Sequence, residues 1–397
     1  MVEHVLNDSL LGCDVDRNWQ QPPENTLESL RHGILHSDGI ELDLRKTADG
    51  QLIVHHDAKP SSVKWQENKN KKYVEDITSE EMMALGFPTI QEVLADNEIQ
   101  TELIDHGKFI CLELKRPHPR SITGPGFFGG SVLVQTMAET ISQLDSILSE
   151  FEIPLQSTVY YAFHNKMHQS VKLSKTQRQW AELLPVVPRI GNSFFKKMIA
   201  YPQYAFTPFS KLIRKHQTRG SSMVPCAIEY FKPITRSALF GKRVGLNGRK
   251  LDHFSKCQKG FPVYVWPCHE KYEKRILDAG ITGLTDNLDP NLTWLPSGNA
   301  RWARYSTKPL DEKQLQLLYD VNEENHLDVI NQLNDETPSW HECDKTRKLE
   351  LIKYWRKKWN WNYSVDELIE KSTITPPLQT PKIIGHRGSG KTSRPVL

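Results

Sequence analysis

Apolar positions along the chain follow two periods, and together these predict alternating strands and helices. Short runs rich in Val, Ile, Leu, Phe and Tyr are typical of strands, and the longer stretches between them carry apolar residues at helical spacing. This alternation indicates an α/β protein with parallel strands. The predicted strands are Gly39–Leu44, Phe109–Lys115, Thr158–Phe163, Leu184–Ile190, Pro225–Tyr230, Pro262–Trp266, Ile281–Thr285 and Lys382–His386. Eight such strands can close into a barrel, which leaves no sheet edge exposed.

Two local sequence signals predict a hairpin and a helix start in the region before residue 60. The run Gln51–His56 follows the first predicted strand through Asp49-Gly50, a strong hairpin signal, so it is predicted to form an antiparallel flap. The first helix is expected to begin at Asn25 as its N-cap, with Glu28 as the partner in a capping box.

The remaining stretches are less regular. Residues 191–222 are rich in Lys, Arg, Phe and Tyr and are interpreted as a long loop or insertion. Residues 308–375 are interpreted as a helical block. Leu349, Ile352, Trp355 and Trp359 stand near helical spacing within the basic, aromatic segment Lys345–Tyr363. A membrane-surface role for that segment is conceivable, but packing on the barrel is favoured.

Composition narrows the class of protein. The 397 residues are 38% hydrophobic, which supports a sizeable core, and 51 basic against 48 acidic residues give a formal charge of +3. That balance argues against general nucleic-acid binding. The first residues lack the basic-then-apolar order of a signal peptide, and no run reaches the ~18 apolar residues of a membrane span. Six cysteines without framework spacing favour free thiols, so a soluble, cytoplasmic protein is expected.

Charged residues stand two apart at the ends of two predicted strands. Glu41 and Asp43 point to one face, and Glu113 and Lys115 repeat this geometry. The carboxyl ends of barrel strands carry the active site. Three carboxylates meeting there would repel one another unless a hard divalent cation neutralised them. Surface ion pairs are the alternative interpretation of the same residues.

Histidines accompany these carboxylates. Alternation along the hairpin favours His56 over His55 as the one that faces them, and its titration near neutrality suits proton transfer. The last predicted strand ends in His386-Arg387-Gly388, where the arginine fork suits phosphate oxygens. Gly385–Thr392 also fits the P-loop pattern, but only five residues follow Thr392, too few for the helix that a P-loop requires. The nucleotide-binding interpretation is therefore disfavoured.

Together these residues resemble the glycerophosphodiester phosphodiesterase family. The resemblance rests on PENTLES at Pro23–Ser29, ELD at Glu41–Asp43, TADG at Thr47–Gly50, HHD at His55–Asp57, ELK at Glu113–Lys115, VYVW ending at Trp266, and GLTDNLDP at Gly283–Pro290. It covers about residues 22–290 and 382–390. The resemblance implies a (β/α)8 TIM barrel of the phospholipase-C-like phosphodiesterase type, here with its first strand supplied by the C-terminus and with an added helical block.

The resemblance also implies an activity and roles for the site residues. Metal-dependent hydrolysis of a glycerophosphodiester would release sn-glycerol 3-phosphate and an alcohol. Glu41, Asp43 and Glu113 would bind one divalent cation, Mg2+ or Ca2+, with Mn2+ as an alternative. His386 and His56 would share acid–base work. Arg387, Lys115 and Trp266 would contact phosphate and substrate. A water or the substrate's own 2-hydroxyl could attack, and an ordinary core tryptophan is the alternative for Trp266.

One departure from the family concerns the order of the pieces, because the His-Arg-Gly strand comes last here. We divide the chain into a barrel at 1–307, a helical linker at 308–380 and the first barrel strand at 381–397. Circular permutation is favoured, and the alternative is a piece of a tandem protein. The expected partner is a small glycerophosphodiester, without nucleic acid. The aromatic, basic segment 191–222 could admit a lipid tail, and peripheral contact with lipid is a further interaction that stays open. Lysophospholipase D or sphingomyelinase D activity, or a non-catalytic binding module, stay open, as does the oligomeric state.

Overall fold

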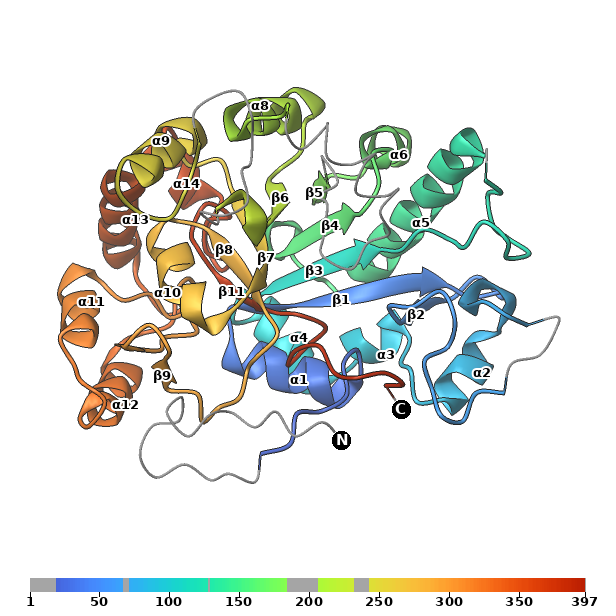
Figure 1. Ribbon diagram of the computed structural model, residues 1–397, viewed down its shortest axis with the longest axis horizontal. Helices are drawn as coiled ribbons and strands as arrows, with labels where there is room; N and C mark the ends of the chain where they lie inside the picture. Colours follow the sequence, from blue (N-terminus) through green and yellow to red (C-terminus); the bar gives the residue numbers. More distant parts are fainter. Residues whose placement is uncertain (1–18, 67–70, 128, 184–205, 232–242, 397) are drawn as a thin grey trace.

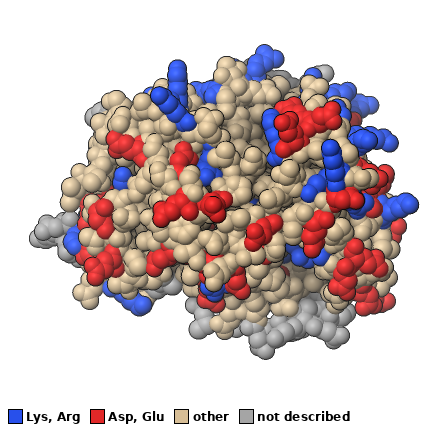
Figure 2. Space-filling view, turned by 180° about the vertical axis from the view of Figure 1, so that it is seen from behind, with Lys and Arg blue, Asp and Glu red and all other residues tan. Residues whose placement is uncertain are grey.

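The fold is described from a computed structural model of the chain. It describes residues 19–66, 71–127, 129–183, 206–231 and 243–396. In this part of the chain, no helix combines the length and apolar character needed to cross a membrane. Acidic and basic side chains are interspersed over the face shown in Figure 2, without a large area of one sign.

Eight parallel strands form a nearly closed barrel surrounded by helices (Figure 1). Each strand hydrogen-bonds to its neighbour along the order β5–β4–β3–β1–β11–β8–β7–β6. At the seam between the two end strands, the backbone N–H of Ser222 donates to the carbonyl of Trp180 at 2.8 Å. The strands are β1 Gly39–Lys46, β3 Phe109–Leu114, β4 Thr158–Ala162, β5 Gln179–Glu182, β6 Val224–Ala227, β7 Val263–Cys268, β8 Thr282–Thr285 and β11 Ile383–Gly385. The predicted barrel class is confirmed.

Strand β11, from the end of the chain, lies between the first and the last barrel strands that precede it. Ile384 is in register with Leu284 of β8 on one side and with Gly39 of β1 on the other. Both pairings are parallel, and Ile383 and Ile384 are almost fully buried. The C-terminal strand therefore closes the gap that strands β1 to β8 would otherwise leave. The evolutionary route to this order, permutation or a tandem piece, stays a prediction.

Helices cover the outside of the barrel and connect its strands (Figure 1). The short strand β2, Leu52–Val54, pairs antiparallel with the end of β1 and forms the predicted flap. A two-stranded ribbon, β9 Trp294–Leu295 and β10 Asn299–Ala300, precedes the helical block. The helices around the barrel are α1 Leu27–His36, α2 Ser79–Ala84, α3 Ile90–Leu94, α4 Asn97–Ile104, α5 Gly130–Glu150, α6 Met167–Ser174, α8 Phe209–Arg219, α9 Gly248–Gln258 and α10 Glu270–Asp278.

The helical block packs against the barrel, as predicted. It contains α11 Glu312–Tyr319, α12 His326–Glu336, α13 Lys345–Trp359 and α14 Val365–Glu370. Trp355 and Trp359 of the basic, aromatic helix α13 are buried. The Trp359 indole N–H donates to the carbonyl of Asp278, at the end of α10, at 2.9 Å. Both tryptophans are buried inside the protein and cannot enter a lipid surface, which disfavours a membrane-surface role for α13.

Alternation along β1 sorts its side chains between two environments. Ile40, Leu42 and Leu44 join the core between the strands and helices α1, α4 and α5. Glu41 and Asp43 point the other way, into the barrel. The strand therefore holds its carboxylates by burying a leucine or isoleucine on either side of each one.

Two local predictions within the described residues are wrong, and a third, the strand Leu184–Ile190, lies outside those residues. The described strand that precedes it is β5, which ends at Glu182. The strand predicted to end at Tyr230 ends at Ala227 and continues as a 3-10 turn. Within the predicted loop 191–222, residues 209–219 form the amphipathic helix α8.

Candidate active site

Three buried carboxylates converge at the carboxyl ends of neighbouring strands. Asp43 of β1 lies in register with Glu113 of β3, and Glu41 stands two residues earlier on β1. Glu41 and Asp43 are fully buried and Glu113 is 5% exposed. One oxygen from each side chain lies within 4.8 Å of the others. This is the cluster of acidic side chains that strand alternation predicts.

Burial and mutual repulsion make this cluster electrostatically demanding. Burial raises the pKa of Glu113 to about 8, with Asp43 and Glu41 adding to the rise against Lys115. Burial and Asp43 also raise the pKa of Glu41. Burial opposes ionisation of Asp43 too, but Lys115 and Arg387 hold its pKa well below the usual range. Nearby side chains thus compensate one carboxylate far better than the other two, and oxygen donors in such a set suit a hard divalent cation.

Two cations lie against these carboxylates. The Lys115 ammonium contacts Glu113 and lies 2.8 Å from an oxygen of Asp43. The Arg387 guanidinium reaches Asp43 at 3.1 Å through Nε and Glu24 at 2.5 Å through its terminal nitrogen. Arg387 has a φ of +57°, and its backbone N–H donates to Glu41 at 2.9 Å. The guanidinium is therefore held inside the site from both its backbone and its side chain.

Asn25 was predicted as a helix cap, and that prediction is wrong. The N-cap of α1 is Thr26, whose hydroxyl accepts from the backbone of Ser29. Asn25 has a φ of +61°, and its side-chain amide donates to Asp43 at 2.9 Å. Its backbone N–H donates to the carbonyl of Arg387. Asn25 therefore links Asp43 of β1 to Arg387 near the C-terminus, and it is not the N-cap of α1.

Each predicted histidine is bonded to an aspartate through Nδ1. His386 Nδ1 lies 2.5 Å from Asp286, and His56 Nδ1 lies 2.7 Å from Asp57. An ionised carboxylate only accepts hydrogen bonds, so each Nδ1 donates and Nε2 is left for proton exchange. His386 Nε2 lies 4.0 Å from Glu41. The pairing fixes the orientation of both rings.

The environments of the two rings differ. Burial lowers the pKa of His386, but the bond to Asp286 and the charge of Glu41 outweigh it and raise the pKa above its ordinary value. At His56 burial dominates and lowers the pKa, although Asp57 opposes the change.

His55 points away from the site. Its Nε2 lies 3.0 Å from the carbonyl of Lys59, and its ring packs edge-on against Phe87 at 4.4 Å. Burial lowers its pKa to about 4. This residue is a neutral core histidine near neutral pH, whereas His56 is half-buried beside the carboxylates.

The tail after β11 adds a cation that no sequence pattern indicated. Arg394 lies 2.6 Å from Glu24, 3.2 Å from Asp57 and 3.3 Å from His56 Nδ1. Thr392 exchanges two hydrogen bonds with Glu24, one from its backbone and one to its hydroxyl. The tail therefore ties the His56–Asp57 pair to the segment before α1.

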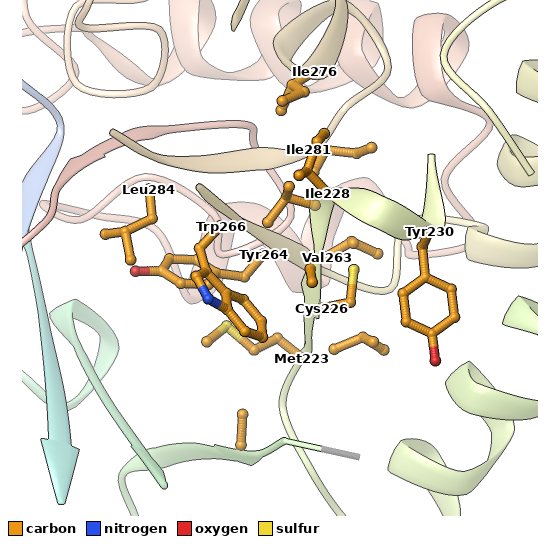
Figure 3. Packing of buried hydrophobic residues seen from close by; sticks show 14 of the residues in the cluster. Met223, Cys226, Ile228, Tyr230, Val263, Tyr264, Trp266, Ile276, Ile281 and Leu284 are labelled. Atoms are coloured by element: carbon orange, nitrogen blue, oxygen red, sulfur yellow. The ribbon is translucent and has the colours of Figure 1, made fainter. Parts of the chain in front are cut away.

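Aromatic side chains line the barrel next to the carboxylates. Tyr161 of β4 donates its hydroxyl hydrogen to Glu41 at 2.5 Å. Trp266 of β7 is 8% exposed, and its ring meets Phe163 edge-on at 5.3 Å. Figure 3 shows the Trp266 indole beside Tyr264, among apolar side chains of β6, β7 and β8. Trp266 thus stands in the barrel wall, and its exposed edge is small.

Comparison with known proteins identifies the family. Residues 18–215 match the model of the glycerophosphoryl diester phosphodiesterase family. Residues 18–215 belong to this family. This assignment gives the enzyme class, a phosphoric diester hydrolase. No curated protein matches the chain.

Solved glycerophosphodiester phosphodiesterases are similar to the chain at low identity. One from Thermotoga maritima is 15% identical, with 66% of this chain and 88% of that chain covered and a TM-score of 0.42. A putative one from Silicibacter pomeroyi is 15% identical, covering 68% and 88%, with a TM-score of 0.46. An Oleispira antarctica phosphodiesterase, solved with sn-glycerol-3-phosphate, is 14% identical, covering 67% and 88%, with a TM-score of 0.41.

The family motifs contain more residues of the site than the sequence analysis assigned to it. Glu24 and Asn25 lie in PENTLES, Asp57 in HHD and Asp286 in GLTDNLDP, yet none of them was assigned to the site from sequence. Asp57 and Asp286 lie within quoted family motifs, and that position was the sequence signal that could have assigned them to the site. The bonds of Asn25 and the position of Arg394 depend on tertiary contacts and carried no comparable signal.

The two adjacent histidines give a matched pair of variants for this phosphodiesterase. We expect His56→Ala and His386→Ala each to lower turnover by about 10²–10⁴, the usual range for acid–base groups. His55→Ala should leave turnover nearly unchanged but cost about 1–3 kcal/mol of stability, because it removes a buried ring that packs on Phe87 and its hydrogen bond to the Lys59 carbonyl. Initial rates and urea unfolding separate the two effects. A dispensable His56 with an essential His55 would refute this assignment.

The structure around the P-loop-like segment supports the phosphodiesterase interpretation. Described residues 386–396 contain no helix, and Lys391 is exposed while Arg387 is buried among carboxylates. We therefore expect Lys391→Ala to keep near-normal turnover and Arg387→Ala to lose it by about 10² or more, as expected for a charge-assisted contact in a dry site. ATP binding, measured by calorimetry, should be undetectable. Tight ATP binding that Lys391→Ala abolishes would contradict this interpretation.

Proposed function

We propose that the chain hydrolyses a glycerophosphodiester to sn-glycerol 3-phosphate and an alcohol such as choline or ethanolamine, with one divalent cation, Mg2+ or Ca2+. The observation that carries the proposal is the buried cluster of Glu41, Asp43 and Glu113 beside Arg387 and two His–Asp pairs. Anion-binding cations, oxygen ligands and two proton carriers are the groups that phosphodiester hydrolysis needs.

The residues present fit a divalent cation. Glu41, Asp43 and Glu113 would hold it, since each offers a buried oxygen within reach of the others. When bound, such an ion polarises a phosphoryl oxygen and neutralises charge that develops on it. Burial, together with the negative charge of neighbouring carboxylates, raises the pKa values of Glu41 and Glu113, and a bound cation would stabilise their ionised forms.

The remaining groups act on the two sides of the phosphate. The planar fork of Arg387 would bind two non-bridging oxygens, and Lys115 would add a point charge. His386 and His56, each oriented by its aspartate, would exchange protons with the attacking oxygen and with the leaving alkoxide. Trp266 would provide an apolar wall for the glycerol carbons, with Phe163 beside it.

The substrate is tested by offering competing diesters to the full chain. Glycerophosphocholine, glycerophosphoethanolamine, lysophosphatidylcholine and sphingomyelin should be incubated separately with Mg2+ or Ca2+, and products resolved by chromatography. We expect choline or ethanolamine release from the two glycerophosphodiesters, abolished in His386→Ala. Choline release from the lysophospholipid or sphingomyelin alone would replace the proposal by lysophospholipase D or sphingomyelinase D activity. Binding without turnover of any diester would indicate a non-catalytic module.

A further inference from the structure

Apolar side chains are exposed around the mouth of the barrel, on loops that follow the carboxyl ends of strands. Ile122 is 80% exposed and Phe127 is 64% exposed, both between β3 and α5. Val63, after β2, is 74% exposed, and Phe163, at the end of β4, is 44% exposed. Scattered exposed apolar residues are ordinary, but a group around one opening requires a physical explanation. We call these four residues the rim patch.

The rim patch is held by contacts between loops. The Ile122 backbone donates to Asp76 at 2.8 Å, and the ring of Tyr73 stacks on His118 at 3.7 Å. These contacts join the β2–α2 segment to the β3–α5 segment. Phe163 lies between Lys115 and Trp266 of the active site, at 5.7 and 5.3 Å. Phe163 therefore borders the catalytic opening directly, and the two joined segments carry the other three residues of the patch.

Basic side chains are interleaved with the rim patch. Lys64, Arg116 and Arg120 are exposed, and none has an ion-pair partner among the described residues. Arg120 lies over the ring of Phe127 at 5.6 Å. Residues 116–131 contain both arginines and no acidic residue. Exposed phenylalanine and isoleucine with unpaired cations match an anionic lipid interface, where rings and aliphatic chains enter the headgroup region and cations meet phosphate.

We propose that the mouth of the barrel docks on an anionic lipid surface through the rim patch and these three cations. Docking would set the active-site opening against the membrane. The proposal concerns membrane binding and does not depend on the identity of the hydrolysed diester.

Sedimentation of the full chain with lipid vesicles tests the proposal. Phosphatidylcholine vesicles with phosphatidylglycerol should bind the chain, and pure phosphatidylcholine vesicles should bind it far less. We expect Ile122→Ser with Phe127→Ser to lower the bound fraction at least about ten-fold, because both apolar anchors are removed. Arg116→Ser with Arg120→Ser should weaken binding to the anionic vesicles and reduce its salt dependence, since exposed charges are screened.

Matched controls lie at the opposite side of the molecule, on α11 and α13 (Figure 1). Leu317→Ser removes an apolar side chain that is 42% exposed, and Lys353→Ser with Lys357→Ser removes two exposed cations. Both controls should bind vesicles as the unmodified chain does. Circular dichroism, together with turnover of soluble glycerophosphocholine if the proposed function holds, checks that the rim variants fold.

Three results would overturn the proposal. The first is an unmodified chain that binds neither type of vesicle. The second is a folded rim-patch variant that binds as well as its controls. The third is self-association of the chain that the rim variants abolish while vesicle binding persists, because the patch would then be a protein contact. Loss of catalysis alone leaves the vesicle result unaffected, so failure of the proposed function is distinguishable.

Discussion

Removal of residues 381–397 is expected to leave a chain that neither folds cooperatively nor hydrolyses a phosphodiester. Strand β11 is paired on both sides, so its loss exposes backbone groups of β1 and β8. Each buried unpaired group costs about 1–3 kcal/mol. A few such losses approach the ~5–15 kcal/mol stability of a typical domain. Solubility, circular dichroism and urea unfolding of the truncated chain measure the effect.

The truncation also removes charge from the site. Arg387 is the partner of the fully buried Glu24 and Asp43, and breaking a buried pair from one side leaves an uncompensated charge. The full-length His386→Ala variant is the matched control, because it loses a proposed catalytic group and keeps the strand. A soluble truncation with a cooperative unfolding transition would show that β11 is not needed to complete the barrel.

Relocation of the strand provides the reciprocal experiment. Residues 381–397 placed before residue 22 through a flexible joint, without residues 1–21, should give a folded and active chain in the family order. The contacts of Thr392 with Glu24 indicate that the two joined segments already lie together. An inactive, unfolded product would argue against interchangeable positions for this strand.

Chelation of divalent cations is expected to abolish phosphodiesterase activity, and Mg2+, Ca2+ or Mn2+ should restore it. Metal ions contribute several kcal/mol to phosphoryl chemistry, and each 1.36 kcal/mol is ten-fold in rate, so a loss of about 10²–10⁴ is expected. Glu41→Gln, Asp43→Asn and Glu113→Gln should each weaken restoration. Asp49→Asn, in the hairpin turn, is the control.

Metal binding can also be measured without an activity assay, from the thermal stability of the chain. A cation that binds only the folded chain at 100 times its Kd stabilises it by about 2.7 kcal/mol, so Tm should rise on adding metal. The rise should shrink in the three carboxylate variants and persist in Asp49→Asn. Full activity after exhaustive chelation would contradict the metal assignment.

Much of the fold was predictable because strand periodicity and burial agree. Glu41, Asp43 and Glu113 were found from alternation alone, since apolar residues on either side fix which face each carboxylate occupies. Strand β5 was missed because its residues are less β-branched than the following Leu184–Ile190 run.

The rest of the site depends on contacts between the two ends of the chain. Asparagine is a preferred residue type at helix N-caps, but the position of Asn25 is explained by its hydrogen bonds to Asp43 and to Arg387. Arg394 reaches Glu24 and His56 only because β11 is inserted beside β1. Local patterns carry no information about such distant partners, so these residues appear only when the barrel is assembled.

The central claim is a phosphodiesterase site built from both ends of one chain, and phosphorus NMR of a single reaction tests it most directly. The full chain should be incubated with sn-glycero-3-phosphocholine and Mg2+ or Ca2+. We predict that the diester resonance is replaced by that of sn-glycerol 3-phosphate, with or without a transient cyclic phosphate. The conversion should be absent in His386→Ala and in Asp43→Asn. A folded, metal-supplied chain that leaves the diester resonance unchanged would contradict the account.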